Sequence, residues 1–152
     1  MTLTRRHFMT AALAVSAAGV IARPAMARTP AVYANDGIAI DRTDPVAYFS
    51  QGAPVAGSPD ITHVWDGATW HFASTANRDS FAATPEAFAP QFGGYCAYAV
   101  SEGYTASTVS EAWKIVDGKL YLNFSRRIQR RWERDAAAHI AKGHANWPGV
   151  LG

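Results

Sequence analysis

The sequence predicts a small α+β domain. Two pairs of short strand-like segments, each pair joined by an Asp-Gly dipeptide, predict two β-hairpins, and segments between and after them have the spacing of short helices. The alternation of strands and helices that builds a parallel sheet is not apparent. The chain has 152 residues, 49% hydrophobic, 17% charged and 12% aromatic, which indicates one domain with an aromatic core and excludes a disordered chain.

Residues 1–27 have the composition of an export signal. Two arginines, Arg5 and Arg6, precede an apolar run over 11–22, and Ala-Met-Ala at 25–27 is a cleavage site of the small-x-small type. The arginine pair resembles a twin-arginine signal, and an ordinary secretory signal is the alternative. The apolar run is shorter than the roughly 20 residues of a transmembrane helix. We therefore expect a bacterial periplasmic protein without an anchor after signal removal.

The lead-in and the first element follow the signal. Residues 28–43 are expected to be extended, ahead of a domain over 44–124. Asp44 stands where its side chain can cap a short buried element over 44–49. Glycines and prolines over 52–60 predict a loop.

The first hairpin is predicted over 61–72. Its central Asp-Gly supplies the positive φ angles of a two-residue type I′ turn. In that register His63 lies opposite Trp70, and Ile61 lies opposite Phe72 on the same face. His63 then lies on an otherwise apolar face, where a buried imidazole needs a polar partner.

Three short helices are predicted between the hairpins. Ser74 caps the first, which ends before Pro85, and a helical turn over 85–90 follows. The third covers 95–100 and comes after Gly93-Gly94, a pair that lets the backbone approach a ligand closely.

The rest of the chain predicts a second hairpin and one long helix. The hairpin covers 113–124, with Asp117-Gly118 at its turn. Ser125 caps a helix that Gly143 ends, and the segment 125–152 packs on the domain through apolar residues at helical spacing.

Cys96 is the residue that most clearly indicates chemistry. As the single cysteine, it excludes an intramolecular disulfide and an all-cysteine zinc site. It lies near a predicted helix start, where free N–H groups stabilise a thiolate, and a thiolate is both a nucleophile and a ligand for soft metals such as Cu(I). The alternative is a small buried hydrophobe. His63 is the expected partner, as metal ligand or as base, and its own alternative is a core histidine.

The predicted last helix also carries an arginine cluster. Arginines in a first helical turn oppose the helix dipole, which indicates an anionic partner. Acidic residues of the same domain are the first candidate; lipid headgroups or a partner protein are the others. Nucleic acid is not expected, because removal of residues 1–27 takes away three arginines and no acid and changes the formal net charge from +2 to −1. The cluster comprises Arg126, Arg127, Arg130, Arg131 and Arg134.

Several motifs carry a resemblance to a known family. They are Trp65-x-Gly67-x-x-Trp70-x-Phe72-x-Ser74, Asn77-Arg78-x-x-Phe81 and Pro90-Gln91-Phe92-Gly93-Gly94-Tyr95-Cys96-Ala97. Together they resemble the YHS domain, and in particular the small exported YHS-domain proteins of bacteria. The likeness spans most of the mature chain. It implies a hairpin-and-helix fold related to treble-clef modules and a role in handling heavy metals such as copper.

The resemblance also concerns the cysteine. Some exported relatives are described as selenoproteins, which implies a chemically used chalcogen at Cys96. The metal-binding relatives use several cysteines, whereas this chain has one, and all three methionines lie in the predicted signal. A Cu(I)-type site in the mature chain therefore needs Cys96 with His63 or with a second molecule.

Three functions follow, in order of preference. The first is an exported module that binds or passes on a soft metal ion through Cys96, with a periplasmic protein or a metal donor or acceptor as partner. The second is a thiol-dependent redox or peroxide-reactive enzyme, with Cys96 as nucleophile and His63 as base. The third is a non-catalytic interaction domain in which Cys96 only packs.

Overall fold

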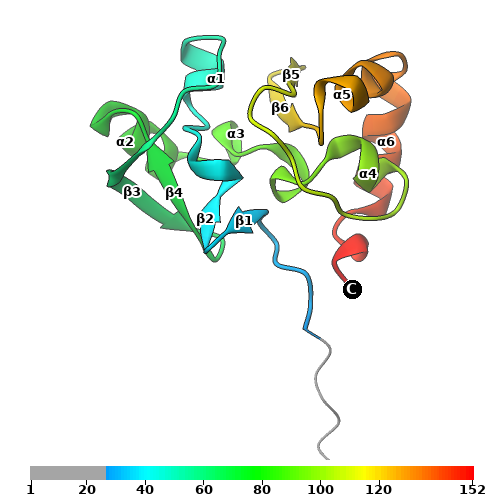
Figure 1. Cartoon of the computed structure of the whole chain (residues 1–152), viewed down its shortest axis with the longest axis horizontal. Helices are drawn as coiled ribbons and strands as arrows, with labels where there is room; N and C mark the ends of the chain where they lie inside the picture. Colours follow the sequence, from blue (N-terminus) through cyan, green and yellow to red (C-terminus); the bar gives the residue numbers. More distant parts are fainter. Residues whose placement is uncertain (1–26) are drawn as a thin grey trace, which may run out of the picture.

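A computed structural model describes residues 27–152, so the predicted export signal lies outside the described residues except for its last position. This part of the chain is α+β, as predicted, with a four-stranded sheet of order β1-β2-β4-β3 and a separate β5–β6 hairpin (Figure 1). No helix within it is long and apolar enough to cross a bilayer. The strands are β1 (Ala34–Asn35), β2 (Ile38–Ala39), β3 (Ser58–Trp65), β4 (Ala68–Phe72), β5 (Trp113–Val116) and β6 (Lys119–Leu122). The helices are α1 (Ala47–Ser50), α2 (Thr75–Ala83), α3 (Pro85–Phe88), α4 (Ala97–Ser101), α5 (Arg126–Glu133) and α6 (Ala136–Asn146).

The lead-in takes part in the sheet instead of being only extended. Asp36 and Gly37, at φ 51° and 77°, turn the chain between β1 and β2. Ile38 of β2 then pairs in parallel with Thr69 of β4. The segment therefore adds two strands to the edge of the first hairpin.

The first hairpin has the predicted register near its turn. Asp66 and Gly67 have φ angles of 49° and 78°, and His63 lies opposite Trp70. Further along, the prediction is wrong: Phe72 pairs with Ser58 and not with Ile61, because the register of β3 shifts between residues 58 and 62. Pro59 lies in this shift and has no N–H for the ladder, which explains the bulge.

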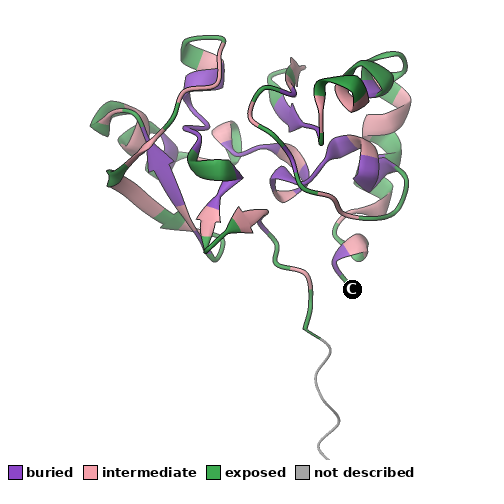
Figure 2. Ribbon diagram, viewed as in Figure 1, coloured by how far each residue is buried: buried purple, intermediate pink, exposed green. Residues whose placement is uncertain are grey.

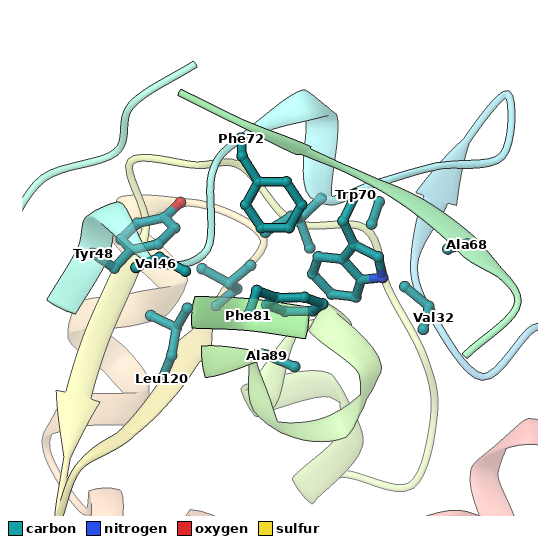
Figure 3. Close-up of a cluster of buried hydrophobic side chains, with 12 residues drawn as sticks. Val32, Val46, Tyr48, Ala68, Trp70, Phe72, Phe81, Ala89 and Leu120 are labelled. Atoms are coloured by element: carbon teal, nitrogen blue, oxygen red, sulfur yellow. The ribbon is translucent and has the colours of Figure 1, made fainter. Parts of the chain in front are cut away.

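The first core lies between the sheet and α2. Phe81 of α2 has no exposed surface, and its ring centroid lies 5.0 Å from that of Trp70 and 5.2 Å from that of Phe72. Figure 3 shows these rings together, with Leu120 of β6 beside them. The second hairpin therefore packs against the core that the first hairpin and α2 form.

A second core lies among α4, α5, α6 and β6. It contains Phe92, Tyr95, Val100, Tyr121, Trp132 and Leu151. Tyr121 points into it while its neighbours Leu120 and Leu122 point into the first core, because successive side chains of a strand face opposite sides. β6 therefore contributes side chains to both cores.

The C-terminal segment forms two helices where the sequence predicts one. Asp135 separates the two helices, α5 and α6. It caps α6, because its carboxylate accepts a hydrogen bond of 3.3 Å from the Ala138 N–H. Gly143 does not end a helix but is buried inside α6. A Cβ atom there would lie 2.5 Å from Cζ of Phe92, so this glycine permits close packing.

The predicted caps are confirmed. Ser74 accepts from the Asn77 N–H (3.1 Å) at the start of α2, and Ser125 accepts from the Ile128 N–H (3.2 Å) at the start of α5. Asp44 is completely buried, and its Oδ1 accepts from the N–H of Ala47, the first residue of α1, at 3.3 Å. These side chains satisfy helix amides that would otherwise lack a partner.

Candidate functional site

Cys96 is the residue immediately before α4, close to the predicted helix start, although the predicted helix over 95–100 already includes it. The two glycines before it have φ angles of 61° and 82° and turn the chain sharply. A side chain at Gly93 would strike the carbonyl of Ala31, and one at Gly94 would come within 2.7 Å of Ile40. The glycine pair therefore serves close packing against the lead-in.

The sulfur of Cys96 is buried and hydrogen-bonded. The side chain is 1% exposed; its Sγ accepts from the Phe124 N–H at 3.3 Å, and its thiol donates to Oδ1 of Asn123 at 3.6 Å. Burial raises the pKa of the Cys96 thiol, and the backbone N–H groups of Ala99, Phe124 and Tyr98 offset part of that rise. The expected amides are present, but at neutral pH the group is a thiol, and not the thiolate that the sequence predicts.

His63 lies far from Cys96. Its half-buried ring packs edge-on against Phe81, with 6.2 Å between ring centroids. Its strand, β3, is at the opposite end of the long axis of the molecule from α4 (Figure 1). Cys96 and His63 of one chain are therefore not brought together. Within residues 27–152, no group of three or more His, Cys, Asp or Glu is arranged to hold a metal ion.

A cleft of about 210 Å³ opens beside Cys96. Two aromatic side chains that line it are unusually exposed for their type: Tyr104 at 52% and Phe124 at 53%. Figure 2 shows how α5, next to the cleft, is mostly exposed whereas β4 is mostly buried. The cleft is lined by Cys96, Tyr98, Ala99, Tyr104, Ala106, Phe124 and Ile128.

The arginine cluster makes no intramolecular ion pair in the described chain. The ion pairs between residues 27 and 152 are Arg78 with Asp79 and, if the imidazole is protonated, His139 with Glu102. The prediction that acidic residues of the same domain pair with the cluster is therefore wrong. One member has an aromatic partner instead: the Arg131 guanidinium lies 5.1 Å from the ring centroid of Tyr98.

Sequence reasoning missed three residues of this site: Tyr104, Asn123 and Phe124. Asn123 is fully buried, and its Oδ1 also accepts from the Tyr98 N–H at 3.2 Å. Strand alternation predicts Phe124 on the same buried face as Leu120 and Leu122. The strand ends at Leu122, however, so the alternation no longer applies and the ring turns outward.

No protein-family model matches the chain, and comparisons with curated proteins and with solved structures find no match. The resemblance to the YHS domain therefore stays a prediction.

Proposed function

We propose that the mature chain is an exported module that takes up one soft metal ion of the Cu(I) type through the sulfur of Cys96. The observation that carries this proposal is the combination of a cleft at Cys96 with a backbone N–H donated to its sulfur. The cleft offers space beside the ligand atom, and the amide stabilises the negative charge that the sulfur acquires when it binds a metal. Membership of the YHS family belongs to the same proposal.

The ion is cargo in this proposal and not a resident cofactor. Cys96 supplies one soft donor, and the other donors come from the molecule that delivers or accepts the ion. Soft metals select thiolate, and binding releases the thiol proton to solvent. Because burial raises the pKa of Cys96, the apparent affinity rises with pH until the thiol is ionised.

A thiol-dependent enzyme is the second candidate. The N–H groups that face Cys96 favour it, since they would also stabilise a reacting thiolate. The raised pKa of the thiol counts against it, because the thiol form is a weak nucleophile. In the described chain the hydrogen-bond partners of the sulfur are Asn123 and Phe124, and neither is a base.

An anaerobic Cu(I) titration of the purified mature chain against a chelator of known affinity tests the proposal. We expect uptake near one equivalent as a ternary complex in which the chelator supplies the other donors, and the loss of this complex in Cys96→Ser with an unchanged circular-dichroism spectrum. His63→Gln is the control and should bind as the wild type does, because its strand lies at the other end of the molecule. Wild-type protein that takes up no Cu(I), or Cys96→Ser protein that still binds it, would overturn the proposal.

Export is tested separately by cell fractionation of the full chain. Replacing Arg5 and Arg6 together by lysine keeps the charge of the signal. We expect this double variant to stay in the cytoplasm if the signal is of the twin-arginine type. Continued export of the double variant would show an ordinary secretory signal.

A further inference from the structure

A groove of about 450 Å³ runs along α5 next to the Cys96 cleft. The groove and the cleft share two lining residues, Phe124 and Ile128, so the two hollows adjoin. Three arginines line the groove at positions i, i+4 and i+7, which lie on one side of a helix. The complete lining is Phe124, Ser125, Arg127, Ile128, Arg131 and Arg134.

The charge in this groove has no counterpart within the described chain. No carboxylate of residues 27–152 lies within ion-pair distance of the three guanidinium groups. Arg127 also lies in the first turn of α5, where a positive charge opposes the helix dipole. An anion in the groove would relieve both unfavourable interactions. Arg131 is already held against Tyr98, so less freedom is lost when it binds.

The wall between the two hollows is apolar. Phe124 is half exposed on it, and Ile128 is partly buried. Concave sites with mostly apolar linings and a few fixed polar groups, of roughly 300–1,000 Å³, are typical for small molecules. A membrane or a large protein surface requires no such hollow, so the shape favours a small ligand.

We propose that the groove and the cleft together bind a small amphipathic anion. Its carboxylate or phosphate head lies among Arg127, Arg131 and Arg134, and its acyl or aryl body lies against Phe124 and Ile128 toward the Cys96 cleft. This site goes beyond the proposed metal function, because it needs neither a metal ion nor the thiol.

Calorimetric titration of the mature chain with decyl phosphate, below its micelle concentration, tests the site. We expect decyl phosphate to bind at least about tenfold more tightly than inorganic phosphate, because only the alkyl phosphate uses the apolar wall. Sodium decanoate, which shares the alkyl chain but carries a carboxylate, shows which head is preferred. Decanol, which lacks the charge, should bind at least about tenfold more weakly than decyl phosphate.

Variants of α5 provide matched controls. Arg127→Gln and Arg131→Gln should each weaken decyl phosphate binding about tenfold, the usual effect of losing one charge-assisted hydrogen bond. Arg130→Gln removes the same charge from the same helix but does not line the groove, so we expect a change of less than about twofold. These titrations contain no Cu(I), so their outcome is independent of that of the Cu(I) titration.

Three results would overturn the proposal. Equal losses in Arg130→Gln and Arg131→Gln would show unspecific attraction to the helix. Equal affinities for inorganic phosphate and decyl phosphate would show that the apolar wall does not contribute to binding. Binding to phosphatidylglycerol vesicles, without binding of monomeric decyl phosphate or decanoate, would make this face a membrane-docking surface.

Discussion

Asp44→Asn tests the bonding that joins the start of α1 to the start of α2. The fully buried carboxylate accepts four hydrogen bonds. Oδ1 accepts from the N–H groups of Val46 (2.8 Å) and Ala47 (3.3 Å), and Oδ2 accepts from the N–H of Ala73 (2.8 Å) and from Nδ2 of Asn77 (2.7 Å). Asparagine keeps the shape but replaces one acceptor oxygen by an NH₂ donor.

The loss of folding stability in Asp44→Asn depends on which hydrogen-bond partners the new NH₂ group faces. Val46 and Ala47 are buried, so the amide oxygen is expected to stay with their N–H groups. The NH₂ group then meets Asn77, which can turn its own amide round and accept. The Ala73 N–H loses its acceptor, and the remaining bonds lose the assistance of a charge. One lost bond and three weakened ones amount to about 2–3 kcal/mol.

Urea unfolding of the chain over residues 28–152, followed by tryptophan fluorescence, measures this difference. A loss of about 2–3 kcal/mol corresponds to a melting temperature lower by about 10 °C for a domain of this size. Asp44→Ala should cost more, because the buried N–H groups of Val46 and Ala47 then also lack an acceptor. Asp60→Asn is the control: Asp60 is exposed, and its substitution should change the free energy of unfolding by less than about 0.5 kcal/mol. An Asp44→Asn protein as stable as Asp60→Asn would refute this account.

Three further predictions concern packing and pH. Gly143→Ala gains about 1 kcal/mol of helix propensity but forces a methyl group against the buried ring of Phe92, so we expect a net loss of about 1 kcal/mol by urea unfolding; a stabilised variant would contradict the packing. Burial raises the pKa of Cys96 above its ordinary 9.0, so the folded state holds its proton longer than the unfolded state does, and stability should fall as pH rises above about 9. Cys96→Ala should flatten that decline, and equal alkaline slopes would show that the thiol does not contribute. Burial, aided by Arg42, lowers the pKa of His71 below its ordinary 6.5, so stability should fall as pH drops below about 6.5. His71→Gln should reduce this acid slope, and an unchanged slope would contradict it.

Local turn and cap chemistry made much of the fold predictable. Asp66-Gly67 has the backbone angles that its residue types favour, and this fixed the register of the adjacent pairs. Ser74 and Ser125 begin helices where their side chains can accept from the third following amide. In each case, residues close in sequence determine the structure.

The elements that were missed depend on neighbours far along the chain. Asp36-Gly37 carries the same turn signal as the two predicted hairpins, but its strands are two residues long and form only because β4 offers an edge. Gly143 looks like a helix end, yet Phe92 requires a residue without a side chain there. Neither contact can be predicted from the periodicity of hydrophobic residues, because each joins residues far apart in the sequence.

Some features of the candidate site likewise follow from the local sequence, and others depend on residues far along the chain. The position of Cys96 near a helix start follows from the local sequence, whereas the hydrogen bonds of its sulfur depend on Asn123 and Phe124, which follow β6. The raised pKa of its thiol depends on burial, which the local sequence does not determine. The face of His63 was predicted correctly, and His63 does meet an apolar neighbour, Phe81. Hairpin register does not reveal which of two cores that face meets, and His63 packs at the first while Cys96 lies near the second.

The arginine cluster shows why tertiary contacts, and not composition, distinguish a binding face from a solvated one. Two contacts fix the rotation of α5 about its axis: Trp132 is fully buried against Tyr121, and Nε2 of Gln129 donates to the carbonyl of Trp113 at 2.7 Å. At about 100° per residue from Trp132, the positions 127, 131 and 134 fall on the flank of Ile128, whereas 126 and 130 fall on the other flank. The first flank lines the groove along α5, whereas Arg126 and Arg130 on the second flank are exposed and do not line it. Five arginines that look equivalent in the sequence therefore separate into three that line the groove and two that do not.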